Sequence, residues 1–204
     1  TASQNGESVS SRSGMESYDH FVYCPTPGIS NSSVMNDNSG NAHLPNIANY
    51  QPPWNSVSFS CGGWLQFYLF GVARAFQATG LDKNVKFAGC SAGALTAAGL
   101  ALEGDFDAAI DFCKRECLPK AHGHVSGLFR LNEYVSNCVD LLLIKNGKYQ
   151  DLPDGKLQIS ISKFPTLGAI RTTKYDSALD LKESLLASAA AYPASPIFKH
   201  SKYG

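Results

Sequence analysis

The chain has 204 residues, enough to bury a sizeable core, and we expect a single globular domain. Hydrophobic residues make up 44% of the chain, charged residues make up 17%, and the formal net charge is zero. This balance argues against nucleic acid as a partner and against strong attraction to anionic membranes. No apolar run approaches the length of a transmembrane helix, so we expect none.

The beginning of the chain differs in composition from the rest. Residues 1–50 are rich in Ser, Asn and Gly and show little apolar periodicity. Such a composition is typical of a disordered leader, because it cannot bury enough apolar surface to offset the entropy of folding. We therefore expect the folded domain to cover residues 56–204.

The predicted domain begins with a strand and a pair of glycines. Residues 56–60 (SVSFS) are β-prone, and Cys61-Gly62-Gly63 leads into an apolar stretch over residues 64–76 that predicts a buried helix. Backbone N–H groups at the start of a helix are free to bind an anion. Gly62 and Gly63 are therefore candidates for an oxyanion hole, although an ordinary tight turn explains the same pattern equally well.

A second strand, turn and helix follow over residues 85–102 (VKFAGCSAGALTAAGLAL). Gly89, Ser91 and Gly93 form a G-x-S-x-G motif, the pattern of a nucleophile elbow, whose sharp turn leaves no room for side chains at the two glycines. The motif also occurs by chance in a chain with 18 glycines. The strand before it and the helix after it favour the catalytic interpretation. A helix and a returning strand separate it from Gly62, so both turns are expected at one edge of a parallel sheet.

The remaining predicted elements complete an α/β pattern. Two of them, a strand and its hairpin partner, extend the sheet, and the others are amphipathic helices. The helices are expected over residues 105–117, 131–144 and 180–191, the strand over residues 157–164, and its partner over residues 168–174.

The histidines and cysteines form no metal-binding pattern. Residues 122–124 (HGH) are expected in a flexible polar loop rather than as ligands or bases. The cysteines lack the paired spacing of zinc ligands, so we expect no metal and no cofactor. Most of them lie among apolar residues, which is typical of buried thiols in a reducing compartment, and we expect an intracellular location. The cysteines are Cys24, Cys61, Cys90, Cys113, Cys117 and Cys138.

Four stretches of the chain resemble a known family. They are SVSFSCGGWLQFYLFGVARAF from Ser56, KFAGCSAGALTAAGLAL from Lys86, DGKLQISISKFP from Asp154 and SLLASAAAYPASPIF from Ser184. Over residues 56–204 the chain resembles the patatin-like phospholipase domain and, within it, the adipose triglyceride lipase-like branch. The order and spacing of the first two stretches are the most specific part of this resemblance.

The resemblance implies a three-layer α/β/α sandwich around a mostly parallel sheet, and hydrolysis of acyl esters in phospholipids or neutral glycerides. It implies a Ser-Asp dyad that needs no metal, with Ser91 as nucleophile and the amides of Gly62 and Gly63 as the oxyanion hole. Two positions depart from the family pattern. Cys61 stands where relatives often have a glycine, and Gln66 replaces a glycine common in the lipase branch.

The resemblance also implies a catalytic aspartate in an Asp-Gly-Gly or Asp-Gly-Ala motif a little after residues 196–198. The sequence reaches Gly204 without such a motif. Four earlier aspartates do not fit, because they precede the strand or the helix that should lead to it. They are Asp151, Asp154, Asp176 and Asp180. We therefore expect a C-terminally truncated fragment that is nearly inactive without its base.

Two other functions stay open at this point. A hydrolase with an ordinary Ser-His-Asp triad would use His200, the only histidine late enough in the chain, but no acid partner recommends it. A non-catalytic lipid-binding or regulatory protein would keep the elbow and lack the dyad. For the hydrolase, the expected process is lipid degradation. Its expected partners are a lipid ester substrate and, at the periphery, a membrane or lipid-droplet surface.

Overall fold

The computed structural model describes residues 54–203, with gaps at residue 124, residues 145–147 and residues 193–194. The leader predicted over residues 1–50 lies outside the described residues. Among the helices in the described part, none is both long enough and apolar enough to cross a membrane.

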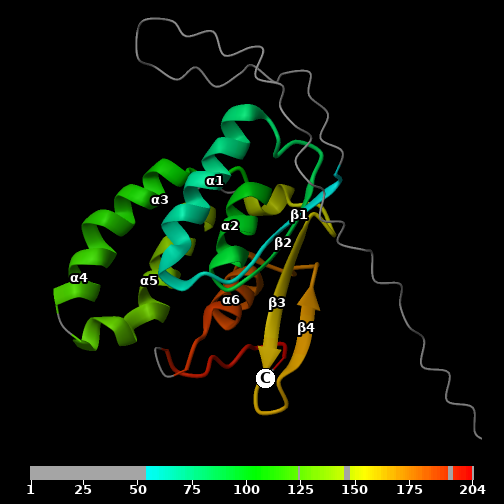
Figure 1. The fold of residues 1–204 in the computed structure, drawn as a ribbon. Coiled ribbons are helices and arrows are strands. Elements are labelled where there is room, and N and C mark those ends of the chain that lie inside the picture. Colours follow the sequence, from blue (N-terminus) through cyan, green and yellow to red (C-terminus); the bar gives the residue numbers. More distant parts are fainter. Residues whose placement is uncertain (1–53, 124, 145–147, 193–194, 204) are drawn as a thin grey trace, which may run out of the picture. The chain divides into compact units, whose positions relative to one another are not determined.

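A four-stranded sheet runs along one side of the described helices (Figure 1). Its strands are, in spatial order, β1 (Ser56–Phe59), β2 (Lys86–Cys90), β3 (Leu157–Lys163) and β4 (Gly168–Thr172). The first three run parallel, with Phe59 beside Gly89 and Gly89 beside Ile159. β4 returns antiparallel to β3, which confirms the predicted hairpin. The fold is α/β with a mostly parallel sheet, consistent with the α/β/α architecture that the resemblance implies.

Two successive crossovers connect the parallel strands. The short helix η1 (Gly63–Leu65) and α1 (Gln66–Thr79) lead from β1 to β2, and α2 (Ala92–Ala101) follows β2 directly. Both crossovers advance in the same direction along the sheet, and such connections are right-handed, so α1 and α2 lie on the same face. Helix α2 packs against the sheet and α1 packs against α2 (Figure 1).

Helix α2 is buried along almost its whole length. Every residue from Ala92 to Leu100 is buried, because small side chains let the helix approach the sheet and the neighbouring helices closely. The Ala- and Gly-rich sequence after the predicted elbow therefore has a packing role. It holds the start of α2 rigidly against the ends of the strands.

Helix α1 is less buried than predicted. It packs through one face only, on α2 and on α3 (Phe106–Phe112), where the rings of Phe70 and Phe106 lie 5.4 Å apart. The opposite side of its first turn faces solvent, because the described residues place no second layer there. The buried residues of α1 are Phe70 and Ala73. The exposed large residues here are Trp64 and Leu65 on η1 and Tyr68 in the first turn of α1.

The helix predicted over residues 105–117 is present but changes its pitch. The Asp105 carboxylate caps α3 by accepting a hydrogen bond of 2.9 Å from the Ala108 N–H. A π-helical turn, η2, follows over Cys113–Cys117. The predicted buried face is confirmed in Phe106, Ala109 and Cys113.

The polar loop predicted over residues 122–124 is wrong at its start. Helix α4 (Leu118–Gly123) continues from η2 and includes His122, whose side chain is exposed. His124 lies outside the described residues. The helical path runs without a break from α3 through η2 and past Pro119, so no loop begins before Gly123.

The last two predicted helices are confirmed with shifted ends. Helix α5 (Leu131–Val139) continues into the π-helical segment η4 (Asp140–Ile144). Helix α6 (Ala178–Ala189) starts at a cap in which Ser177 Oγ accepts a hydrogen bond of 3.1 Å from the Asp180 N–H. It packs on β3 and α5. Two further short 3-10 helices are η3 (Val125–Arg130) and η5 (Lys148–Asp151).

Candidate active site

Ser91 lies at the sharp turn between β2 and α2. Its backbone has φ of +52° and ψ of −124°, a conformation that a residue with a side chain adopts at a cost of about 1–3 kcal/mol. Such strain persists only where the surrounding packing enforces it, and it is concentrated at functional sites. Ser91 also stands at the N-terminus of α2, where the helix dipole favours negative charge.

The packing that enforces this turn comes from two glycines. A Cβ atom on Gly89 would collide with the backbone of Gly93 and Ala94. One on Gly93 would collide with the carbonyl groups of Phe59 and Ser60. The first turn of α2 therefore rests directly on the end of β1, which is the close approach that the motif requires.

The loop after β1 that contains Gly62 and Gly63, called the glycine loop below, lies beside the turn at Ser91. A Cβ atom on Gly62 would stand 3.8 Å from the Cβ of Ala92, the residue that follows Ser91. Gly63 has φ of +51°, in the left-handed region that favours glycine. The structure thus brings the glycine loop and the elbow together at the carboxyl edge of the parallel strands, as the sequence predicted.

A serine on α6 ties the elbow to the sheet. The Ser91 N–H donates to Ser188 Oγ at 2.8 Å, and Ser188 Oγ donates to the Ser160 carbonyl at 2.7 Å. These two hydrogen bonds join the elbow, α6 and β3. Ser188 was not among the site residues predicted from the sequence. The available signal was its polar side chain within the run of small residues in the stretch SLLASAAAYPASPIF.

Among the described residues, no aspartate is hydrogen-bonded to the Ser91 side chain. Asp154 and Asp176 pair with lysines at 2.7 Å and 2.9 Å. Asp180 accepts a hydrogen bond from the Asp176 N–H at 2.9 Å. Asp151 ends η5 and Asp154 precedes β3, so both lie at the amino edge of the parallel strands, opposite Ser91.

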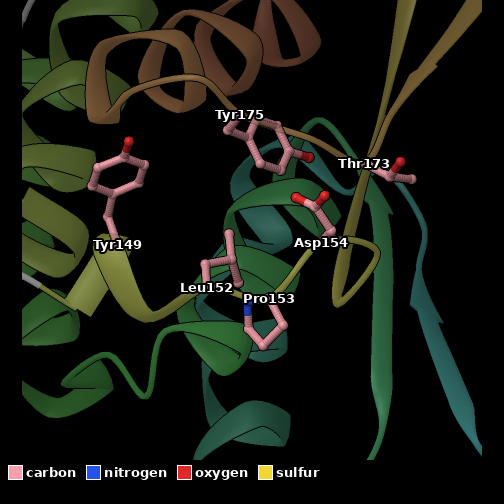
Figure 2. Close-up of a pocket in the computed structure, with 6 residues that line it drawn as sticks. All are labelled: Tyr149, Leu152, Pro153, Asp154, Thr173 and Tyr175. Atoms are coloured by element: carbon pink, nitrogen blue, oxygen red, sulfur yellow. The ribbon is translucent and has the colours of Figure 1, made fainter.

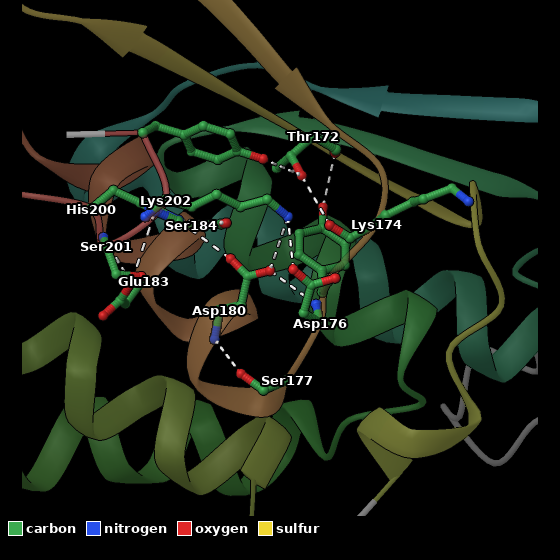
Figure 3. A network of polar contacts seen from close by, with 12 residues as sticks. Thr172, Lys174, Asp176, Ser177, Asp180, Glu183, Ser184, His200, Ser201 and Lys202 are labelled. Carbon is green, nitrogen blue, oxygen red and sulfur yellow. Dashed lines mark hydrogen bonds and ion pairs between the residues drawn. The ribbon is translucent and has the colours of Figure 1, made fainter.

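A second group of residues of the types found in catalytic triads lies around His200 (Figure 3). It joins α6 to residues 195–203, called the C-terminal segment below. His200 Nε2 lies 3.1 Å from Ser184 Oγ and 3.6 Å from Asp180 Oδ1. The Lys202 N–H donates to His200 Nδ1 at 3.0 Å. Because Nδ1 accepts this bond, a neutral ring carries its proton on Nε2 and donates it to Ser184.

The serine of this second group is closed to substrate, since Ser184 is 0% exposed. His200 is 2% exposed and lines the larger hollow described below. Both of its ring nitrogens are engaged by residues of α6 and the C-terminal segment. The geometry therefore argues against a triad of Ser91 and His200. In the sequence no acid partner for His200 was evident, and the structure supplies one in Asp180. The serine beside His200, however, is Ser184 and not Ser91.

Two hollows lie at opposite edges of the sheet. Figure 2 shows the smaller one, about 20 Å³, which has room for a single water. It lies before β3 and after β4, at the edge away from Ser91, so it is no candidate for the active site. Its lining residues are Tyr149, Leu152, Pro153, Asp154, Thr173 and Tyr175.

The larger hollow, about 230 Å³, lies at the carboxyl end of β3. Mainly apolar side chains from β3, β4, α6 and the C-terminal segment line it. Its wall adjoins the residues that hold the elbow, because Ile161 in the wall directly follows Ser160, which accepts the hydrogen bond from Ser188. Apolar space therefore occurs at the same edge of the sheet as Ser91.

The described cysteines fall into two groups. As predicted, three are buried, at η2 and on α5, and the hydrogen bond with Cys113 together with burial raises the pKa of the Cys117 thiol. The other two differ, since Cys61 is exposed and Cys90 is half-buried. Within the described part of the chain, no three His, Cys, Asp or Glu side chains are grouped as metal ligands would be. The buried thiols are Cys113, Cys117 and Cys138.

Comparison with known proteins identifies the family. No curated protein and no solved structure matches the chain. The family model described as patatin-like phospholipase matches residues 57–203 of the 204. This match begins within β1 and covers both glycine-lined turns, the whole sheet and α6. The chain therefore belongs to the patatin-like phospholipase family.

Proposed function

We propose that this chain carries the nucleophile of a lipid acyl hydrolase, a serine carboxylic-ester hydrolase acting through a Ser-Asp dyad. Family membership supports lipid acyl hydrolysis as the activity. The observation that carries the assignment to Ser91 is its strained backbone at a turn packed against the glycine loop. Lipid esters are the substrates, and the adipose triglyceride lipase-like branch points to neutral glycerides among them.

The reaction proceeds by acyl transfer. Ser91 Oγ attacks the ester carbonyl while a base takes its proton, and the negative charge that develops on the carbonyl oxygen is stabilised by the amides of Gly62 and Gly63. As the tetrahedral intermediate collapses, the protonated base gives its proton to the departing alcohol, which leaves an acyl-serine and a free base. Water, activated by the same base, then releases the fatty acid.

The proposed base is an aspartate that follows residue 204 in a longer protein. Support comes from the family resemblance and from the described aspartates, none of which is hydrogen-bonded to the Ser91 side chain. The proposal predicts that a protein extended through an Asp-Gly-Gly or Asp-Gly-Ala motif is active, whereas the chain of 204 residues is nearly inactive.

Covalent trapping tests the nucleophile directly. We expect the extended protein to hydrolyse a short-chain p-nitrophenyl ester and to react with a fluorophosphonate, which leaves its phosphonyl group on a catalytic serine. Mass spectrometry of the digested protein should find the group on the peptide that contains Ser91. Labelling of another serine would contradict the assignment. An extended protein with neither hydrolysis nor labelling would support the non-catalytic, lipid-binding alternative.

A lipid surface is the proposed docking partner of the exposed start of α1. Trp64, Leu65 and Tyr68 are 43%, 68% and 72% exposed and directly follow the glycine loop. Residues 61–73, which include η1 and the first turn of α1, contain no charged side chain. An uncharged apolar patch at the mouth of the site suits an uncharged lipid surface, from which the substrate enters.

Binding to phosphatidylcholine vesicles tests this docking. We expect Leu65→Asp to weaken vesicle binding about tenfold or more, since burial of a leucine side chain contributes roughly 1.5–3 kcal/mol. Leu179→Asp is the matched control, because Leu179 is 63% exposed on α6, away from the glycine loop. Equal effects of the two substitutions would refute the patch as the docking surface.

A further inference from the structure

Two free thiols lie at the ends of the two strands that build the site. The register of β1 and β2 pairs Phe59 with Gly89, so Cys61 and Cys90 follow at neighbouring strand ends. The side chain and the backbone N–H of Cys61 both lie within interaction range of the Cys90 thiol. Neither thiol is in a disulfide. Two thiols thus lie side by side at the carboxyl edge of the sheet.

The spacing of the backbone permits a bond between them. A disulfide needs Cα atoms about 4.4–6.8 Å apart. Cys61 lies one position past the residue beside Cys90, so a strand spacing of about 4.8 Å and a rise of about 3.3 Å per residue put their Cα atoms roughly 6 Å apart. Cys61 is exposed and Cys90 half-buried, so an oxidant in solvent can reach the pair. The buried thiols at Cys113, Cys117 and Cys138 differ in this respect.

The position of the pair gives the bond a consequence. Cys61 directly precedes Gly62, whose amide belongs to the proposed oxyanion hole, and Cys90 directly precedes Ser91. The sulfurs of a disulfide are about 2.05 Å apart, closer than any hydrogen bond allows. Joining them draws the glycine loop toward the elbow and displaces its amides. A misplacement of about 1 Å at a reacting centre costs about a hundredfold in rate.

We propose that Cys61 and Cys90 are an oxidative modification site at which a peroxide forms a disulfide that reversibly inhibits the hydrolase. The inhibitory part rests on the proposed function, whereas the disulfide itself does not. Neither residue takes part in the chemistry of ester hydrolysis. The site is a pair of side chains that the proposed mechanism leaves unused.

The chemistry balances with the peroxide as the only co-reactant. The Cys61 thiolate attacks one peroxide oxygen, the O–O bond breaks, and Cys61 becomes a sulfenic acid while the departing hydroxide takes a proton to give water. The Cys90 thiol loses its proton and attacks the sulfenic sulfur, so that the S–S bond forms and the sulfenic oxygen leaves as a second water. Two thiols lose two electrons, and the peroxide is reduced to two waters.

The roles of the two thiols follow from their surroundings. Cys61 is the accessible thiol and reacts with the peroxide first. Burial raises the pKa of the Cys90 thiol, so Cys90 stays protonated near neutral pH and acts second, as the resolving thiol.

Mass spectrometry tests the disulfide without any assay of activity. The extended protein is treated with hydrogen peroxide, its remaining thiols are blocked with iodoacetamide, and it is digested without reduction. We expect a cross-linked pair of peptides containing Cys61 and Cys90, lighter by two hydrogen atoms and lost after treatment with dithiothreitol. Cys61→Ser should abolish this species and Cys113→Ser should retain it. Recovery of both thiols in alkylated form, or of Cys61 only as a sulfinic acid, would overturn the proposal.

Ester hydrolysis, measured before and after oxidation, tests the inhibition. Each variant is compared with its own untreated rate. We expect oxidised wild-type protein to lose about tenfold or more of its rate, with recovery in dithiothreitol, and Cys61→Ser to keep its rate. A cross-linked protein with an undiminished rate would refute the inhibition. A cross-linked protein that never hydrolysed the ester would refute the proposed function and leave the modification site standing.

Discussion

The chain places serine in two very different polar settings. Ser91 is partly exposed, strained, next to the glycine loop, and without an aspartate or histidine bonded to its side chain among the described residues. Ser184 has a histidine at 3.1 Å, and that histidine has an aspartate at 3.6 Å, yet both Ser184 and the histidine are buried. The residues around Ser184 resemble a catalytic triad more than those around Ser91 do. Only the Ser91 side chain, however, is accessible to a substrate.

The difference teaches how to separate a structural polar cluster from a candidate site. In the cluster around His200, both ring nitrogens of the histidine have hydrogen-bond partners, and the bond to Ser184 holds the C-terminal segment to α6 (Figure 3). At the elbow, by contrast, the strain of Ser91 is maintained by close packing of Gly89 and Gly93. Strain held by packing at a solvent-facing turn indicates function, whereas a satisfied buried network indicates stability.

The largest expected effect separates the two serines by activity. In the extended protein we expect Ser91→Ala to lower the rate of p-nitrophenyl ester hydrolysis at least about a thousandfold, because no nucleophile remains. Ser184→Ala should keep the rate per folded molecule and lower the unfolding free energy by about 1–3 kcal/mol, since His200 loses its buried partner. Rates normalised to folded protein decide between them. Equal losses of rate in both variants would contradict the assignment of a catalytic role to Ser91 and a structural role to Ser184.

The second effect concerns the packing that strains the elbow. Gly93→Ala should lower the free energy of unfolding by about 3 kcal/mol or prevent folding, because the added Cβ meets the carbonyl groups of Phe59 and Ser60. Gly71→Ala is the matched control, since a Cβ there meets no atom within 4 Å. It should stabilise α1 by roughly 0.5–1 kcal/mol. Urea unfolding measures both, and a harmless Gly93→Ala would contradict the close approach of α2 to β1.

The third effect concerns the link between the elbow and α6. Ser188→Ala removes the acceptor of the Ser91 N–H and should cost about 1 kcal/mol of stability. We expect kcat to fall while KM stays constant, because the substitution shifts Ser91 without touching the surfaces proposed to bind substrate. Ser188→Thr, which keeps the hydroxyl, should recover most of the rate. A change confined to KM would argue against a positioning role.

The smallest effect uses acid to loosen the cluster around His200. Glu183 accepts hydrogen bonds from the Ser201 hydroxyl and from the Ser201 N–H, and these bonds lower the pKa of the Glu183 carboxyl from its ordinary 4.5. A lowered folded-state pKa gives stability that is present above pH 4.5 and lost as the pH falls through the folded value. The free energy of unfolding of the wild type should therefore fall toward that of Glu183→Gln as the pH is lowered below 4.5.

Denaturant unfolding of the two proteins over a series of pH values checks this sign. The stability difference should be positive near neutral pH and should shrink in acid. A difference that grows as the pH falls would show that the Glu183 carboxylate does not accept the bonds from Ser201.

The order and type of the elements followed from the sequence, because each has a local signature. The β-prone run before Cys61 and the apolar run before Cys90 predicted β1 and β2, alternation predicted β3, and the paired glycines located both turns. Features that depend on packing between layers could not be predicted in this way. The helix that starts at Phe106 widens into a π-helical turn, α4 extends through His122, and η1 leaves Trp64 exposed.

The sequence by itself determined where the candidate nucleophile lies, since G-x-S-x-G between a strand and a helix allows one backbone path and that path presents Ser91. Only the tertiary structure decided what surrounds it. Ser188 meets the elbow from 97 positions away, and Cys61 meets Cys90 across two strands. His200, a candidate base in the sequence, is turned toward Ser184 instead. The physical reason is range: steric rules fix a turn locally, whereas contacts between distant segments depend on how the layers pack.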